Sequence, residues 1–380
     1  MRPRLSGKRY LFTCFVFFFA IGCSATRREE SSERFKKLAR QDPPTVDVAN
    51  LKTLSSIIQE LATKQIVYLG EEHDKFSHHL VQLEILRTLH RDNPKTAVGM
   101  EMFERPFQRA VDDYVGGAVD ERAFLKRSEY FKRWNIDYHL YKPILDYARD
   151  KRLPVVALNA RREIVDKVAK SGLDALSKAE RNEIPANLDF SDQEYRARLK
   201  EIFAEHKGSG EKNLEFFYQA QILWDETMAE SIDQFLKKNP DYRMIVLAGS
   251  GHLQYASGIP KRSFRRNGFS YGVVLNDAEI KPRIADFIVF PEAVAVPSTP
   301  KIGVVVEEQN QQLRVKGFAK ESLAEKAGFK AGDILESIDG ERLSSSDDLQ
   351  IALFYKKAGE TVTIRGRRAE QELEFRIKLP

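Results

Sequence analysis

Cysteine is nearly absent from this sequence: its 380 residues include only Cys14 and Cys23. Both lie close to the start, so the remainder of the chain has neither a disulfide nor a cysteine ligand for a metal. Three motifs are also missing, namely a phosphate-binding glycine loop, a Gly-x-Ser-x-Gly nucleophile elbow and a His-Glu-x-x-His zinc motif. These absences exclude the simplest signatures of nucleotide-binding proteins, serine hydrolases and zinc proteases.

Long apolar runs are also scarce, and the clearest one lies at residues 11–22, after four basic residues. A basic start, a run too short to span a bilayer comfortably and a small-residue cleavage site are typical of a signal peptide, which we predict at residues 1–22. Ala20-Ile21-Gly22-Cys23 resembles a bacterial lipobox, which implies cleavage before Cys23 and lipidation of that cysteine. The alternative is an uncleaved anchor with an incidental cysteine. Ser24, rather than an aspartate, follows the cysteine, and the resemblance to sorting patterns of diderm bacteria implies the outer membrane. We therefore expect a lipid-anchored protein of the cell envelope that faces the periplasm.

An excess of one charge is missing once this leader is removed. The formal net charge of the whole chain is +5, and loss of the four leading basic residues leaves +1. A nearly neutral chain gives no argument for nucleic acid as a partner. Residues 23–47 are polar, of mixed charge, and contain Pro43-Pro44, which predicts a tether.

Residues 48–293 alternate between apolar runs and amphipathic segments. We expect a first helix capped by Asn50, and a charged helical excursion at residues 163–207. The alternation predicts an α/β domain with a mainly parallel central sheet flanked by helices. The expected strands lie at residues 65–70, 95–101, 153–159, 243–249, 271–275 and 287–290. The other expected helices lie at residues 76–90, 106–114, 121–132 and 214–236.

Prolines at residues 291–300 mark a domain boundary, and residues 297–380 predict a small β-rich domain. The runs 325–334 and 338–340 resemble a PDZ domain of the permuted bacterial kind. That resemblance implies that an extended or C-terminal peptide adds as a strand along Ile302, Gly303 and Val304. The alternative is that the domain binds another part of its own chain or a dimer mate.

Titratable side chains follow three of the predicted strands. Glu71, Glu72 and His73 follow the first strand, Glu101 the second and His252 a later one. If the strands are parallel, these groups meet at one edge of the sheet. His73, His252 and Glu101 could then hold a divalent metal, or a carboxylate could orient a histidine as a general base. The alternative is a buried polar network that fixes the loops.

Further candidates line the expected pocket. On the helix at residues 214–236, one face carries Phe217, Gln221, Trp224, Asp225 and Met228. The polar residues among them could line the pocket, support the histidines or act as internal braces. Trp134, Tyr138 and Tyr141 form an aromatic patch, and arginines 105, 161 and 162 could pair with carboxylates. We expect His78 at the surface or at a helix end, and His79 as a satisfied packing residue.

Longer motifs lie at residues 70–74, 99–108, 133–134, 141–145, 157–160, 220–229 and 249–252. Together they resemble the ChaN-like haem-binding lipoprotein family over residues 55–274. The resemblance implies haem or iron acquisition, two haems across a homodimer and tyrosine ligation, with Tyr138, Tyr141 and Tyr255 as candidate ligands. The wider superfamily of Tiki and TraB proteases and erythromycin esterases implies a hydrolase that uses His73, His252 and Glu101.

Three functions stay open from the sequence: a lipid-anchored haem-binding protein, a metal-dependent peptidase or esterase, and a non-enzymatic envelope scaffold. The C-terminal domain departs from the simplest members of the family. A peptide-binding module suits a peptidase or an assembly factor as well as a haem carrier.

Overall fold

The computed structural model describes residues 45–205 and 213–380. The predicted signal peptide, Cys23 and most of the predicted tether lie outside these residues. The unit before Leu51 contains one described element, the 3-10 turn η1 (Val48–Asn50). In the part of the chain that the structure describes, no helix combines the length and apolar character needed to cross a membrane.

A six-stranded sheet forms the centre of the α/β domain, in the order β3-β2-β4-β1-β5-β6. Every neighbouring pair in it is parallel, which confirms the predicted sheet. The central strand β1 pairs with β4 on one side and β5 on the other. The strands are β1 (Ile66–Glu71), β2 (Thr96–Glu104), β3 (Val155–Asn159), β4 (Arg243–Gly249), β5 (Tyr271–Asn276) and β6 (Phe287–Val289).

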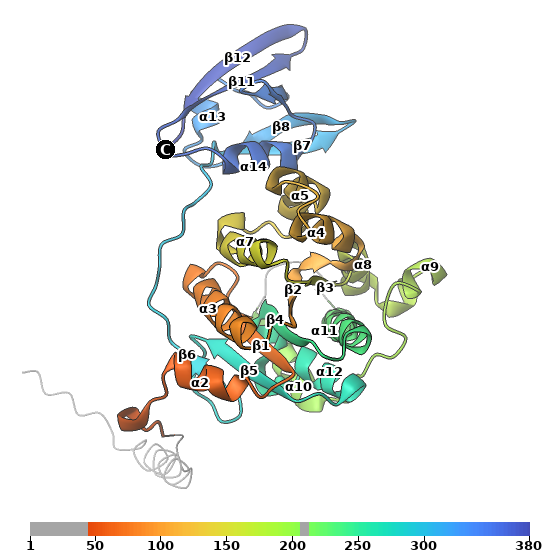
Figure 1. Ribbon diagram of the computed structural model, residues 1–380. Coiled ribbons are helices and arrows are strands. Elements are labelled where there is room, and N and C mark those ends of the chain that lie inside the picture. Colours follow the sequence, from red (N-terminus) through yellow and green to blue (C-terminus); the bar gives the residue numbers. More distant parts are fainter. Residues whose placement is uncertain (1–44, 206–212) are drawn as a thin grey trace, which may run out of the picture. The chain divides into compact units, whose positions relative to one another are not determined.

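Helices cover both faces of this sheet (Figure 1). Val67 and Leu69 of β1 face a core that contains residues of α3 (Phe76–Asp92), α4 (Gln108–Val115) and α7 (Lys142–Lys151). The alternate residues Ile66 and Tyr68 face a second core with α11 (Leu214–Lys238) and α12 (Ile259–Asn267). Because side chains of a strand alternate between faces, the near-continuous apolar run of β1 reflects burial on both sides.

Two predicted boundaries are wrong. The first helix, α2 (Leu54–Leu61), is capped by Thr53, whose side chain accepts a hydrogen bond from the Ser56 amide; Asn50 lies in η1. A hydroxyl at this position satisfies one of the amides that a helix start leaves free. Strand β2 continues to Glu104, so Glu101 lies inside the strand instead of at its end.

The remaining helices of the domain are short. The predicted excursion forms α8 (Arg162–Ser171), η4 (Leu173–Ala175), α9 (Lys178–Arg181) and α10 (Gln193–Glu205). The others are η2 (Arg105–Phe107), α5 (Glu121–Arg127), α6 (Tyr130–Arg133), η3 (Tyr138–Leu140), η5 (Ser250–His252) and η6 (Gln254–Ala256).

A second, antiparallel sheet forms the C-terminal domain, as predicted, in the order β12-β11-β9-β8-β7, with β10 beside β9. Its strands are β7 (Val304–Gln309), β8 (Gln312–Phe318), β9 (Ile334–Ile338), β10 (Glu341–Arg342), β11 (Thr361–Arg368) and β12 (Gln371–Lys378). Two helices complete it, α13 (Leu323–Lys326), capped by Ser322, and α14 (Ser346–Phe354), capped by Ser345. Apolar residues of both helices, among them Ala324 and Leu349, share a core with Ile302, Val315 and Leu335.

Candidate functional site

Strand β2 and the segments that follow β1 and β4 bring His73, Glu101 and His252 together around Gly249. Glu101 Oε2 accepts a hydrogen bond of 2.7 Å from the Gly249 amide, and Glu101 Oε1 lies 3.6 Å from His252 Nε2. A β-carbon added to Gly249 would lie 3.1 Å from His73 Nε2 and 3.6 Å from Glu101 Oε2. The parallel sheet therefore assembles the predicted group at one edge, and we call His73, Glu101 and His252 the strand-end site.

The carboxylate of Glu71 binds the imidazole of His73. Its Oε1 lies 2.8 Å from His73 Nδ1, and it also accepts a 2.6 Å hydrogen bond from the Tyr141 hydroxyl. Burial by itself raises the pKa of the Glu71 carboxyl, but the charge of His79 and the hydrogen bond with His73 hold that pKa below its usual range. For His73, burial lowers the pKa, but the bond to Glu71 and the charge of Glu101 raise it.

Two residues of α3 complete this side of the site. Gln82 donates to Glu71 Oε2 at 2.7 Å and to the Leu69 carbonyl at 3.2 Å, which turns its own Oε1 toward His79 Nδ1 at 3.1 Å. The other nitrogen of His79 faces the His73 carbonyl at 3.1 Å. His79 is fully buried and has partners on both nitrogens, as predicted. Burial is the largest single influence and lowers its pKa, but the charge and hydrogen bond of Glu71, together with the bonds to the His73 carbonyl and Gln82, raise the pKa above its usual value.

Of the two places predicted for His78, the structure shows the helix end, because the residue lies in the first turn of α3 and its side chain is fully buried. Its Nδ1 accepts a hydrogen bond from the Glu72 amide at 3.0 Å, and its Nε2 lies 3.0 Å from Asp277 Oδ2. An imidazole at the start of α3 thus fixes the loop that follows β1. Glu72 itself is exposed and does not join the strand-end site.

Asp225 of α11 holds His252. Its Oδ1 lies 2.7 Å from His252 Nδ1, and its Oδ2 accepts a 2.7 Å hydrogen bond from the hydroxyl of Tyr195 on α10. Burial lowers the pKa of His252, but the charges of Glu101 and Asp225 and the hydrogen bond with Asp225 raise it to about 9. Sequence reasoning missed Tyr195, because it lies in the excursion and no sequence pattern connects it to the site.

Both imidazoles therefore bind a carboxylate through Nδ1 and leave Nε2 for the shared centre beside Glu101. Hydrogen-bond partners of this kind fix the tautomer and orientation of a histidine. The arrangement can transfer a proton or offer a nitrogen lone pair to a ligand. Among the described residues, no group of three or more His, Cys, Asp or Glu is placed to hold a metal ion. The metal site therefore stays a prediction.

Glycine acts here by allowing neighbouring groups to approach the backbone closely. Gly70 lies inside β1, and a β-carbon there would meet Leu275 at 2.5 Å and Ser250 Oγ at 2.9 Å. Gly258 is tighter still, because a β-carbon would lie 2.1 Å from the His252 carbonyl oxygen and 3.1 Å from Asp225 Oδ1. These glycines let the loop that carries His252 pack against its neighbours.

A cavity of about 610 Å³ lies beside the site, and we call it the tryptophan pocket. Trp134 packs edge-on against His73 with ring centroids 4.8 Å apart, and Trp224 packs against His252 at 6.0 Å. Both indoles line the cavity, together with Asn159 and the exposed cations Lys132 and Arg162. Two indole planes and three cations, the third being Arg133, therefore adjoin the strand-end site, together with the carboxylates of Glu104 and Asp166.

The other predicted pocket residues lie elsewhere. Tyr138 and Met228 are buried in the two cores of the sheet. Tyr141 is also buried, and its hydroxyl bonds to Glu71. Gln221 is partly buried, as is Tyr255, whose ring stacks under Arg198 with 4.5 Å from guanidinium carbon to ring centroid.

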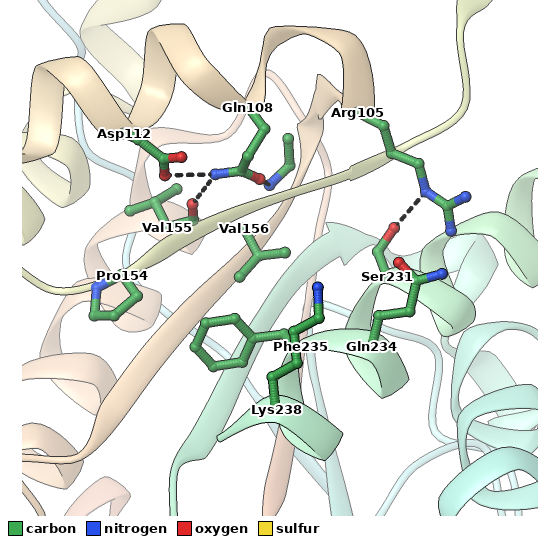
Figure 2. Close-up of a pocket in the computed structure, with 11 residues that line it drawn as sticks. Arg105, Gln108, Asp112, Pro154, Val155, Val156, Ser231, Gln234, Phe235 and Lys238 are labelled. Carbon is green, nitrogen blue, oxygen red and sulfur yellow. Dashed lines mark hydrogen bonds between the residues drawn. The ribbon is translucent and has the colours of Figure 1, made fainter. Parts of the chain in front are cut away.

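Arg105 does not line the tryptophan pocket, and the carboxylate that it pairs with belongs to the protein itself. Its guanidinium donates to Ser231 Oγ at 2.7 Å and to Glu230 Oε2 at 3.0 Å. It lines a second cavity of about 410 Å³ along β3, shown in Figure 2. There the amide of Gln108 donates to the Val155 carbonyl at 2.8 Å and accepts from the Ala157 amide at 2.7 Å.

Together, a parallel α/β sheet and paired imidazole–carboxylate groups at its carboxyl edge define a class of strand-end ligand-binding or catalytic domains. Two family models match the chain. Residues 57–262, more than half of it, match the model "Haem-binding uptake, Tiki superfamily, ChaN", and residues 300–379 match a PDZ domain. The chain belongs to the ChaN haem-binding uptake family, and its C-terminal domain is a PDZ domain.

Individual relatives are more distant. A Campylobacter jejuni structure titled "Cofacial heme binding to ChaN" is 20% identical, covers 62% of this chain and 91% of that one, and has a TM-score of 0.52. At this identity the likeness shows the fold. The Arabidopsis thaliana protein RETICULATA-RELATED 5, chloroplastic, is 23% identical over 57% of this chain and 31% of its own length. A probable CtpA-like serine protease of Staphylococcus haemolyticus is 32% identical over 20% and 16%. The chain thus spans about a third and a sixth of these two curated proteins.

Proposed function

We propose that this protein binds haem in the tryptophan pocket, beside His73 and His252, and serves haem or iron uptake in the cell envelope. The family match supports the ligand, since the family model is described as haem-binding uptake. The position of the pocket supports the place, because its two indoles pack against the two histidines of the strand-end site. The PDZ domain would add a peptide-binding function.

The residues present fit such a group. Haem needs apolar walls, cations for its propionates and a nitrogen or phenolate donor for iron. The indoles of Trp134 and Trp224 supply walls, and Arg162 with Lys132 supplies cations. The side chain of His73 is 35% exposed, so its imidazole is an accessible donor. Of the tyrosines considered, Tyr138 and Tyr141 are fully buried, and Tyr255 is the accessible one.

Titration of the full chain with haemin tests the proposal. We expect a saturable shift of the Soret band at micromolar haemin. Either His73→Ala or Tyr255→Phe should change the spectrum of the bound haem, depending on which residue is the ligand, whereas Tyr138→Phe is the control for a buried phenol. Arg162→Ala should weaken binding about tenfold without changing the spectrum, because it removes one partner of a charged pair. A linear, unsaturable titration would reject haem binding.

A second function, hydrolysis, is favoured by the paired geometry itself. Glu71–His73 and Asp225–His252 present two oriented imidazoles to one centre that also contains Glu101. Such groups can take a proton from water and deliver one to a leaving group. Peptidase and esterase assays with metal analysis of the purified protein test this function. Loss of a measured activity in His252→Ala would support it, and absence of both activity and metal would count against it.

The proposed location and partners rest on sequence and fold. Lipidation of Cys23 would anchor the chain in the outer membrane, and incorporation of labelled palmitate in the parent chain but not in Cys23→Ser tests this. In the PDZ domain, the unpaired edge of β7 and the positive φ of Gly303, 77°, support strand addition of a peptide along Ile302, Gly303 and Val304. A dimer that holds two haems is tested by sedimentation with and without haemin.

A further inference from the structure

Strand β7 has a free edge, and its outward face presents an apolar and an acidic side chain. In the described part of the chain it pairs only with β8, so its other side carries free amides and carbonyls. Val304 and Val306 are partly buried against the core of the domain, and the Glu308 carboxylate accepts from the Ser346 amide at 2.8 Å at the start of α14. The alternate residues, Val305 and Glu307, must therefore face away from α14.

Val305 is an uncovered apolar side chain on this outward face. It is 47% exposed. Its neighbour on β8 is Gly317, which offers no side chain to cover it. An exposed valine on an unpaired edge strand is a site for aggregation unless something covers it. A peptide residue directly opposite Val305 would do so.

Glu307 is an uncompensated carboxylate on the same face. Its neighbour on β8 is Arg314, which donates instead to the Gly332 carbonyl at 3.1 Å. Glu307 is exposed, and within residues 45–205 and 213–380 it has no ion pair. The outward face of β7 thus presents an apolar group and, two residues on, an acidic one.

The register of an added peptide connects these two groups to positions in its sequence. We place the last peptide residue beside Val304, with its carboxylate near Gly303. In an antiparallel pair the residue before the last then lies opposite Val305, and the residue three before the last lies opposite Glu307. Directly opposite residues have their side chains on the same face of the sheet. We propose that the PDZ domain selects C-terminal peptides with an apolar residue directly before the last one and lysine or arginine three residues before it. This inference rests on the proposed peptide binding.

A selection experiment tests the inference without a known ligand. The full chain is used to select from a library of displayed peptides with seven random residues and free carboxyl ends. We expect enrichment of basic residues at the third position before the last and of apolar residues at the position before the last. Selection with Glu307→Lys should favour acidic residues at the third position instead. Glu370→Lys, a change of an exposed glutamate in the turn between β11 and β12, is the matched control and should leave the preference unchanged.

Fluorescence polarisation with a selected peptide gives the magnitude. Replacing its basic residue by alanine should weaken binding about three- to fivefold, and replacing it by glutamate should weaken it further. Glu307→Lys should reverse this order. Equal affinities for the three peptides would overturn the inference and leave peptide binding intact. Failure to select any peptide would reject the proposed peptide binding, and the inference with it.

Discussion

The two histidines of the strand-end site are held by carboxylates that differ in the number of partners they serve. Glu71 binds His73 but also Tyr141, Gln82 and the buried His79. Asp225 binds His252 and the Tyr195 hydroxyl. The side chain of His73 is 35% exposed and that of His252 is 13% exposed. The difference indicates two roles. His73 is accessible from the tryptophan pocket, and His252 is buried and remains protonated at neutral pH.

We expect the largest effect from a backbone clash beside His252. In Gly258→Ala the new β-carbon would meet the His252 carbonyl oxygen at 2.1 Å, a clash that only a backbone shift can relieve. We expect a loss of about 5 kcal/mol in the free energy of unfolding, measured in urea. Gly251→Ala is the control, because a β-carbon there has no neighbour within 4 Å. Equal losses in both variants would show that the close approach at Gly258 does not position His252.

The second effect compares the two carboxylates directly. Glu71→Gln leaves His79, which is 1% exposed, without its negative partner, and we expect a loss of about 3–5 kcal/mol. Asp225→Asn leaves His252 near Glu101 and should cost about 1–3 kcal/mol. The free energy of unfolding at pH 7 measures both. A larger loss for Asp225→Asn would contradict the view that Glu71 carries the heavier electrostatic role.

The smallest effect is the pH dependence of the His252 pair. The pKa of His252 is raised from 6.5 to about 9 in the folded state, so its stabilisation is complete below pH 6.5 and is lost as pH rises through about 9. We expect the stability advantage of the parent chain over His252→Gln, at most about 3 kcal/mol, to shrink between pH 6.5 and 9.5. Urea unfolding across this range measures it. An advantage that grows with pH would mean that His252 is neutral in the fold.

The sequence was sufficient to predict the sheet and the meeting of His73, Glu101 and His252. Both follow from local signals, since apolar runs that end in glycine indicate parallel strands, and parallel strands share a carboxyl edge. For Asp225 the sequence allows three roles, namely pocket lining, support for the histidines and an internal brace. The distance from its carboxylate to His252 shows that it supports the histidine, and that distance depends on how α11 packs on the sheet.

Other residues could not be predicted because their roles arise from tertiary contacts. Tyr195 reaches Asp225 from a short helix whose path over the sheet has no periodic signal. His78 lies at a helix end, as the sequence allows, but its burial arises because the loop after β1 folds over it and the Glu72 amide bonds to it. Arg105 belongs to a family-like motif, but the nearby Ser231 and Glu230 of α11 bind its guanidinium.

The side-chain amide of Gln108 on α4 bonds to the edge strand β3, and this affects how the molecule behaves at high concentration. By bonding to the Val155 carbonyl and the Ala157 amide, it takes the place of a peptide group of another strand (Figure 2). An edge strand closed in this way cannot recruit the same strand of a second molecule, so the groove along β3 resists growth into fibrils. Replacing Gln108 with leucine would reopen that edge and favour self-association.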